Sequence, residues 1–363
     1  MLIIKKISAI SISVSMFLVL LIAAAVSCTT FSNNSEPADD SDESEVLEEV
    51  EKPFIKNGTQ LVISPKFDTG FDVRSLSTED GEKVFGRLNY GDESLVPDWI
   101  FAQWWSRYDI LDGTKEKLSD GVYKYADKTK EFTVDYKNGQ LNFKAMASNC
   151  YDEPRKKSSE MWLHLLIEQT MGSRFLDNPE KLALYKVSDM AELWFEGKFK
   201  LAYFEDKMEG KDIEWLHAAQ FLVFINLQDL ASPSGEGFGQ LMHFGMPVFD
   251  NRYEFSEPYQ AQDMTTPNFI YSLPSKVFTE ESFFKDGKPF GSPDNEWMTI
   301  ELDILPEILK AFEKAKSIGY LPDTELDELY IGALCCGWEV PGTYDAEMQM
   351  KDVGLYAIKT EMY

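Results

Sequence analysis

The sequence lacks most of the residues and motifs from which enzymes build recognisable active sites. It has three histidines, and they form no HExxH or other spaced ligand set. No GxSxG, P-loop or dinucleotide-binding pattern occurs in its 363 residues. Its four cysteines include no CxxC pair. A zinc hydrolase is therefore disfavoured, and we expect neither a metal nor a cofactor.

Positive charge is also scarce, with 35 Lys and Arg against 62 Asp and Glu, for a formal net charge of -27. Such a balance argues against nucleic acid or an anionic membrane surface as a broad partner. Hydrophobic residues make up 44% of the chain, enough for a substantial core. A chain of this length suggests one large domain or two ordinary ones. We favour a single domain over 54–363, with the loop-rich stretch 250–296 as the alternative division between two lobes.

Residues 1–27 have the layout of a signal sequence, with Lys5 and Lys6, an apolar run from 7 to 26, and small residues before Cys28. A retained membrane-spanning helix is the alternative, because about 20 apolar residues are long enough to span. The run contains four serines, which counts against it. The segment Ala25-Val26-Ser27-Cys28 resembles a bacterial lipoprotein lipobox, although alanine replaces the usual leucine. The resemblance implies cleavage before Cys28, acylation of that residue, palmitate included, and anchoring in the bacterial cell envelope.

Residues 28–53 follow as an acidic tract, and 29–53 contain nine acids against one lysine. Such a segment cannot bury enough apolar surface to offset its ordering entropy. We expect a disordered spacer, extended by like-charge repulsion, that holds the folded part away from the membrane. The tract lacks the spaced acids and glycine of a calcium loop.

From Phe54 onward, short runs of β-branched and aromatic residues alternate with Gly, Asp, Asn and Pro, which is typical of an all-β sandwich or barrel. The clearest unit is a hairpin over 131–147. Asn138-Gly139 suits a two-residue type I′ turn, and this turn would pair Val134 with Phe143 and Phe132 with Ala145. One face of the hairpin would then be apolar and the other wet.

Further strands are expected at Leu182–Val187, Ala191–Phe195, Phe199–Phe204, Ala218–Leu227, Leu241–Phe249, Phe269–Leu273, Trp297–Leu302, Glu328–Leu334 and Gly354–Ile358. The run 217–229 reads as a central strand covered on both faces, with Gln220 and Asn226 facing a cleft. One amphipathic helix is expected near 306–318, with Pro306 in its first turn and Gly319 at its end.

Three cysteines remain besides Cys28: Cys150, Cys335 and Cys336. Adjacent cysteines close only a strained ring, and strand alternation points their side chains to opposite faces. Two small apolar fillers at 335 and 336 are the favoured interpretation, with a disulfide from one of them to Cys150 as the alternative.

Two segments carry candidate site residues. In MWLHLLIEQ, strand alternation places Trp162, His164 and Glu168 on one face, with His164 and Glu168 about 13 Å apart. A half-buried structural strand is the competing interpretation. In GMPVFDNRYEF, Asp250 and Arg252 follow a probable strand, where sandwiches often place binding groups; an ordinary turn with an internal ion pair explains them equally well.

The tryptophans are the last group of candidate site residues. Indole rings stack on the faces of sugars while nearby polar side chains hydrogen-bond to the sugar hydroxyls. The segments PDWIFAQWWSRYD, with Trp99, Trp104, Trp105 and Tyr108, and CGWE, with Trp338 and Glu339, have polar flanks and are expected to expose a ring. A carboxylate pair for glycoside hydrolysis leaves no local spacing. Its conceivable members are Glu168, Glu192, Glu196 and Glu339.

The W-H-E strand, the aromatic-rich strands and the helix before a late GWE strand resemble the jelly-roll and concanavalin-like antiparallel β-sandwiches of secreted glycan-handling proteins. The resemblance spans roughly 55–360 and implies a mainly β fold. It leaves three hypotheses. The first is an envelope lipoprotein that binds a polysaccharide without transforming it. The second is a polysaccharide lyase or glycoside hydrolase, and the third is a structural or protein-binding component.

The binding hypothesis assigns stacking to Trp105, Trp162 and Trp338, and polar contacts to Glu168, Asp250 and Arg252. The catalytic hypothesis makes His164 or a tyrosine the base. In it, Arg252 neutralises a uronate and Glu168 acts as acid or orienting group.

Overall fold

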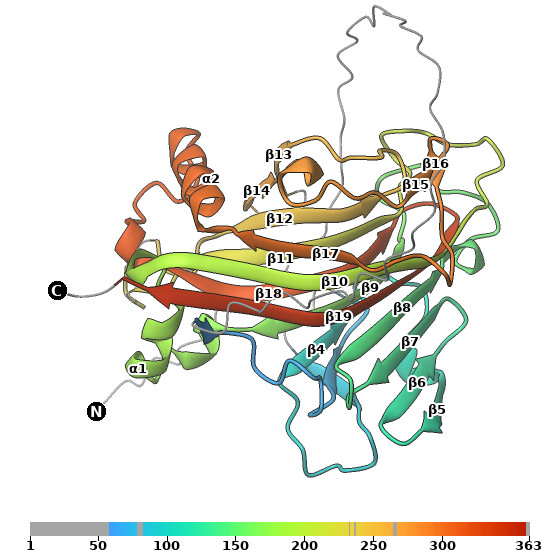
Figure 1. Ribbon diagram of the computed structural model, residues 1–363, viewed down its shortest axis with the longest axis horizontal. Helices are drawn as coiled ribbons and strands as arrows, with labels where there is room; N and C mark the ends of the chain where they lie inside the picture. The colour runs from blue at the N-terminus through green and yellow to red at the C-terminus, as the bar shows by residue number, and fades with distance from the viewer. Residues whose placement is uncertain (1–57, 78–82, 232, 236, 264–266, 361–363) are drawn as a thin grey trace, which may run out of the picture.

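The computed structural model describes residues 58–77, 83–231, 233–235, 237–263 and 267–360. The predicted signal sequence, Cys28 and the acidic tract lie outside these residues. Within them, two large and mainly antiparallel sheets pack face to face (Figure 1). This confirms the predicted mainly β, jelly-roll or concanavalin-like sandwich. No helix in this part of the chain has the length and apolar character needed to cross a membrane.

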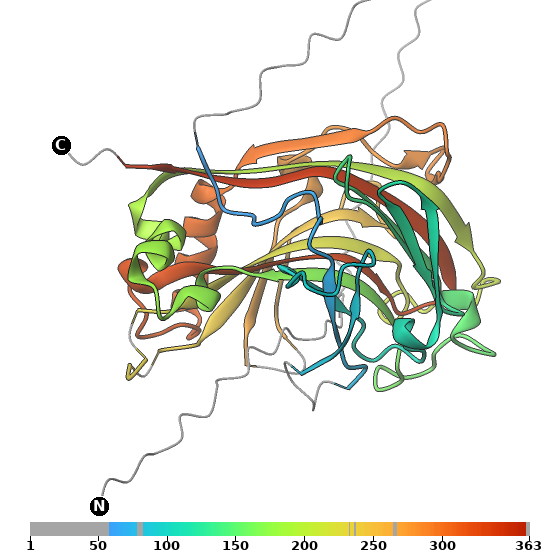
Figure 2. The ribbon, with the colours of Figure 1, turned by 90° about the horizontal axis from the view of Figure 1, so that it is seen from below.

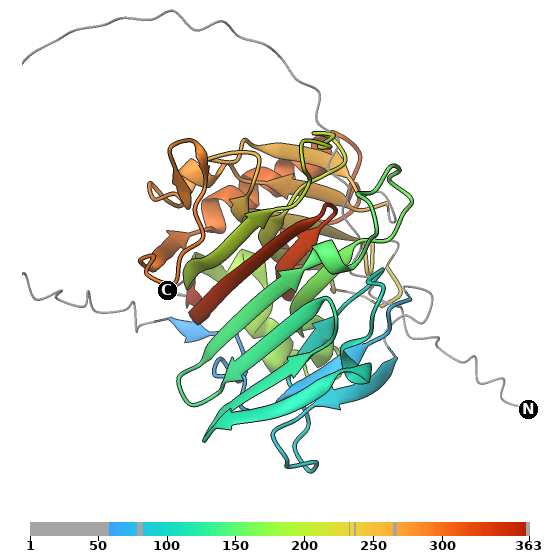
Figure 3. The same ribbon diagram turned by 90° about the vertical axis from the view of Figure 1, so that its right-hand side faces the viewer.

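The first sheet, sheet A, has the order β17-β10-β19-β8-β7-β6-β5, and β1 pairs with β19. Figure 3 shows β10, β19 and the hairpins β5 to β8 side by side. Its strands are β1 (Thr59–Gln60), β5 (Thr114–Ser119), β6 (Val122–Ala126), β7 (Lys130–Asp135), β8 (Gln140–Met146), β10 (Met190–Asp206), β17 (Met298–Asp303) and β19 (Tyr344–Lys359).

The second sheet, sheet B, has the order β13-β14-β12-β11-β18-β9-β4-β2-β3. Only the pairs β12/β14 and β2/β4 are parallel among the described strands. Its strands are β2 (Phe71–Arg74), β3 (Val84–Leu88), β4 (Trp99–Ala102), β9 (Leu163–Thr170), β11 (Gln220–Asp229), β12 (Leu241–Asp250), β13 (Tyr259–Gln262), β14 (Phe269–Ser272) and β18 (Leu329–Val340). A separate pair, β15 (Phe284–Lys285) and β16 (Lys288–Pro289), lies outside both sheets.

The predicted helix is α2 (Leu305–Ser317), with Pro306 in its first turn. It lies between the two sheets at one end of the sandwich and contacts β10 and β12 (Figure 2). Its buried face carries Ile308, Phe312 and Ala315. The chain leaves the helix at Gly319, whose φ of 91° suits glycine.

The main core fills the space between the sheets, where alternate side chains of each strand meet. In β9, Leu163, Leu165 and Ile167 enter this core. Leu166 joins a second, smaller cluster on the other side of sheet B. That side, which turns away from sheet A, is called the outer face of sheet B below.

Two expectations about local structure were wrong. The hairpin β7/β8 pairs Val134 with Leu141 and Phe132 with Phe143, a register that leaves a four-residue loop over 136–139. The Asp135 carboxylate accepts bonds from the backbone N–H of Asn138, at 3.1 Å, and from its side-chain amide, at 2.7 Å. These bonds favour the wider loop. The observed register differs from the predicted one by two residues, so the apolar and the solvated face of the hairpin are still made by the predicted side chains.

The second error is the expected strand Leu182–Val187. There the chain instead forms α1 (Pro179–Leu182) and two short 3-10 turns. Asn178 caps α1 by accepting a bond from Lys181, and Pro179 occupies the first turn. These are ordinary signals for the start of a helix.

Candidate binding site on the outer face of sheet B

Four neighbouring strands bring four polar side chains into one line across the outer face of sheet B. The register pairs His164 with Glu339, Glu339 with Gln220, and Gln220 with Asp250. Directly opposed residues in antiparallel strands have Cβ atoms about 4.5–5.5 Å apart. All four side chains are buried, with exposed fractions between 1% and 7%. We call this set, contributed by β9, β18, β11 and β12, the polar row.

Asp250 at one end of the row is fully occupied by bonds within the protein. Its Oδ1 accepts from the backbone N–H and Nε of Arg252, at 3.0 and 2.9 Å. Its Oδ2 accepts from Nη2 of Arg252 at 2.6 Å and from Nε2 of Gln220 at 2.8 Å. A carboxylate offers about four such positions. Asp250 therefore holds Gln220 and Arg252 in place and has no remaining position for a sugar hydroxyl or an attacking water.

Glu339, in the middle of the row, is a buried carboxyl group whose acidity is altered by its surroundings. Burial raises its pKa well above the usual value of 4.5, and the charge of Asp263 raises it further. Glu339 is 3% exposed. Burial therefore favours the protonated form of Glu339, which is able to donate a hydrogen bond, as an acid held in apolar surroundings does.

His164, next to Glu339, is neutral for the same reason. Burial lowers its pKa to about 3. Backbone groups of Trp162 and Trp104 oppose this shift, whereas the charges of Arg155 and Lys130 add to it. Neither ring nitrogen makes a hydrogen bond of normal geometry with another described residue. The row thus presents a neutral imidazole beside a neutral carboxylic acid.

Glu168 lies on the same face but outside the row. It is opposite Cys335 in the register, four residues along β18 from Glu339. Four residues span about 13 Å along a strand. The paired carboxyl groups of glycoside hydrolases are about 5–5.5 Å apart in retaining enzymes and about 6.5–9.5 Å apart in inverting ones. The Glu168 and Glu339 backbones are therefore too widely spaced for a retaining pair.

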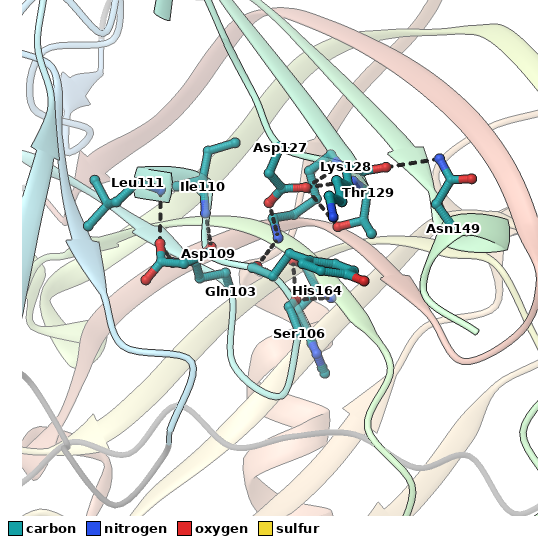
Figure 4. A network of polar contacts seen from close by, with 12 residues as sticks. Gln103, Ser106, Asp109, Ile110, Leu111, Asp127, Lys128, Thr129, Asn149 and His164 are labelled. Atoms are coloured by element: carbon teal, nitrogen blue, oxygen red, sulfur yellow. Dashed lines mark hydrogen bonds and ion pairs between the residues drawn. The ribbon is translucent and has the colours of Figure 1, made fainter. Parts of the chain in front are cut away.

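Two hydrogen bonds between the Ser106 side chain and the backbone of His164 fix the start of β9 and the aromatic residues beside the row. Figure 4 shows Ser106, whose Oγ donates to the His164 carbonyl and accepts from the His164 N–H, both at 3.0 Å. Trp105 precedes this serine and has a positive φ of 55°. Its ring meets Trp162 edge-on, at 5.4 Å between centroids. Trp162 in turn lies 5.1 Å from the His164 ring.

The structure places several of the residues singled out from the sequence on the outer face of sheet B, but it buries three tryptophans that were expected to expose a ring: Trp99, Trp104 and Trp338. The prediction that Trp338 exposes a stacking ring was wrong. Trp338 is 0% exposed in the core between the sheets, and its indole N–H donates to the Phe143 carbonyl at 2.9 Å. Trp162 is on the outer face but 1% exposed, and only Trp105 is half-buried.

Arg252 also differs from its predicted role, because its charge is already neutralised by Asp250. It still borders an open groove of about 380 Å³, lined also by Tyr253, Phe255 and Lys276. Arg155 was not among the residues singled out from the sequence, but it stacks on Trp162 with Cζ 4.4 Å from the ring centroid. It lies in the charged segment 152–160, where no periodic pattern distinguishes it from its solvated neighbours.

The three cysteines, Cys150, Cys335 and Cys336, are buried free thiols, so the alternative of a disulfide to Cys150 is absent among the described residues. Cys336 lies in the main core and Cys335 in the outer-face cluster, which confirms their predicted opposite orientations. In the described part of the chain, no three His, Cys, Asp or Glu side chains are placed to hold a common metal ion.

No protein-family model matches the chain, and no curated protein matches it. Among solved structures, it is similar to endoglucanase cel12A from Rhodothermus marinus, with 12% identity and a TM-score of 0.36 over 68% of this chain and 97% of that one. A family 12 xyloglucanase from Bacillus licheniformis matches at 8% identity and a TM-score of 0.33, over 68% and 97%. The family 11 xylanase from Neocallimastix patriciarum matches at 8% and 0.31, over 68% and 95%. At these values the likeness assigns no activity to this chain.

Proposed function

We propose that this chain binds a polysaccharide on the outer face of sheet B and does not hydrolyse it. The observation that carries the proposal is the composition of the polar row. Glu339 supplies a protonated carboxyl group, whereas its two cross-strand neighbours are His164 and Gln220. Carboxyl, amide and imidazole groups beside aromatic rings are suited to bonding sugar hydroxyls.

Hydrolysis is disfavoured because the row lacks a second available carboxylate. Glycoside hydrolases ordinarily need a pair of Asp or Glu residues. The position across from Glu339 is an amide, which cannot act as nucleophile or base. Asp250, the next residue in the row, has its acceptor positions filled by Arg252 and Gln220.

Polysaccharide cleavage by a lyase is the second candidate, favoured by the neutral imidazole of His164 beside the protonated Glu339. Its weakness is quantitative. A base with a pKa of about 3 takes up a proton at pH 7 at a cost of about 5 kcal/mol. General bases work best with a pKa near the operating pH. Binding without cleavage is therefore the better account of this site.

The test uses the full chain, purified in detergent, with a panel of neutral and acidic polysaccharides. Retention of each polymer and the release of reducing ends or unsaturated products are recorded in the same samples. We expect retention without cleavage, and Glu339→Gln should alter the affinity because it changes the donor pattern of the row. Cleavage abolished by His164→Ala would establish the lyase candidate instead. If no polymer is retained or cut, the binding proposal fails and a protein partner becomes the better hypothesis.

We also propose that Cys28 carries lipid and anchors the chain in the bacterial cell envelope. The support is the apolar run, the small residues before Cys28 and the acidic tract after it. Cells grown with an alkyne-tagged palmitate should label the wild-type chain and not Cys28→Ser. Equal labelling of both would contradict the assignment.

A further inference from the structure

Arg155 is a buried cation without a carboxylate partner in the described part of the chain. Its side chain is 2% exposed. Its guanidinium donates only to backbone carbonyls, those of Pro341 at 3.4 Å, Lys157 at 3.2 Å and Ser158 at 2.8 Å. The charge of Glu160 acts on Arg155 from further away, but its carboxylate accepts the Lys156 N–H at 2.7 Å. A guanidinium withdrawn from water is ordinarily paired with a negative group.

Arg155 stacks on Trp162, and each of these two side chains has a hydrogen-bond donor without an acceptor among the described residues. Nε of Arg155 and Nε1 of Trp162 are both buried and have no hydrogen-bond partner among the described residues. The two side chains are in contact, with Arg155 Cζ 4.4 Å from the Trp162 ring centroid. Buried N–H groups are almost always bonded in folded proteins. Neither group is able to accept a bond, so a group that satisfies them must be an acceptor.

We propose that Arg155 and Trp162 bind an anionic group, a carboxylate or a sulfate, carried by an acidic polysaccharide. The inference rests on the proposed function, because Trp162 adjoins His164 at one end of the polar row. A sugar held along the row would place its anionic substituent against this pair. Charge-assisted bonds from a guanidinium to such a group are shorter and stronger than bonds between neutral partners.

The surrounding structure holds both donors in position. The backbone N–H of Ile213 donates to Nδ1 of His217 at 2.9 Å, so Nε2 carries the ring proton and donates to the Arg155 carbonyl at 2.7 Å. Trp105 packs edge-on against Trp162 from the half-buried side. Arg252, the cation first assigned to a uronate, is excluded because Asp250 already neutralises it.

The experiment compares matched polymers that differ only in their anionic group, at about 0.15 M salt so that the net charge of the chain is screened beyond about 8 Å. The full chain in detergent is tested with polygalacturonate against its fully methyl-esterified form, and with dextran sulfate against dextran. We expect the acidic member of at least one pair to bind at least tenfold more tightly. The pair that shows the difference identifies the group as carboxylate or sulfate.

Two variants test the donors separately. Trp162→Phe keeps the ring stack and removes the N–H, and Arg155→Gln removes the charge. Each should reduce the preference for the acidic polymer, which is the ratio of its affinity to that of the neutral one, at least fivefold. Arg87→Gln is the matched control, because Arg87 is an exposed arginine on β3 paired with Asp72; it should leave the preference intact. If Arg155→Gln lowers the thermal unfolding midpoint too far for assay, Trp162→Phe decides alone.

The inference is overturned if acidic and neutral polymers bind equally, or if the preference survives Trp162→Phe. Binding of neutral polymers alone would overturn it while leaving the proposed function standing. If no polymer of either kind binds, both fail together.

Discussion

Replacing Gln220 with glutamate would put a third carboxyl group into the polar row, directly between those of Glu339 and Asp250. The amide of Gln220 now donates to Asp250 Oδ2 at 2.8 Å. In Gln220→Glu two carboxylates would meet there. Two unit charges about 4 Å apart interact by about 4 kcal/mol at an effective dielectric constant of about 20. Arg252 offsets part of this repulsion, so we expect a loss of about 2–3 kcal/mol in the free energy of unfolding at pH 8.

The loss should depend on pH in a defined direction. Burial and the neighbouring acids would raise the folded-state pKa of the new carboxyl group above its unfolded value. Such a group binds its proton more tightly in the folded state, so the variant regains stability at low pH and loses it as the pH rises. Urea unfolding at pH 5 and pH 8 measures the difference. We expect a deficit of about 1 kcal/mol or less at pH 5.

Gln220→Met is the control, because it removes the bond to Asp250 without adding charge. Its cost should be about 1 kcal/mol and similar at both pH values. If Gln220→Glu behaved like this control, the close approach of the row would be refuted. The same variant supplies the carboxylate that hydrolysis needs beside Glu339. Reducing ends released by Gln220→Glu and not by the wild-type chain would show that the amide keeps the site from cleaving.

Three further predictions concern stability. Burial and the charges of neighbouring acids raise the pKa of Glu196 to about 7, so its contribution to stability is lost as the pH rises through that value. Glu196→Gln should therefore gain about 1–2 kcal/mol at pH 8 and little at pH 5 in urea unfolding, and an equal gain at both would contradict the shift. Trp338→Ala should cost about 3–5 kcal/mol, because it empties core volume; an unchanged unfolding midpoint with weakened polymer binding would restore its stacking role. Lys130→Met should cost about 3–5 kcal/mol by leaving the charge of Asp127 buried, and adding Asp127→Asn should recover part of the loss in the same thermal assay.

Strand alternation predicted much of the outer face because it needs only local sequence. It correctly placed His164 and Glu168 on one face of β9, with Trp162 against the His164 ring just before the strand, and it separated Cys335 from Cys336. The same rule was available for Trp338. Trp338 is two residues from both Cys336 and Val340, so its side chain points to the same face of β18 as theirs, into the main core. The polar character of its neighbour Glu339 was therefore misleading. In a strand, the side chains of adjacent residues point to opposite faces of the sheet, so one does not indicate the surroundings of the next.

The polar row itself was beyond local sequence, because its members come from strands far apart in the chain. His164, Gln220, Asp250 and Glu339 meet only through the registers of β9, β18, β11 and β12. Those registers include a bulge between Phe221 and Leu222, which moves Asp250 relative to Gln220. No spacing in the sequence encodes such a shift.

The same alignment explains why the two ends of the row differ in charge. In the centre, burial favours the uncharged forms of Glu339 and His164. At one end Asp250 and Arg252 cancel each other. At the other end, the described residues give Arg155 backbone carbonyls and no carboxylate as partners, and under our proposal a ligand neutralises its positive charge. Under the proposed function, this one cation is what would make the outer face of sheet B select an acidic polymer over a neutral one.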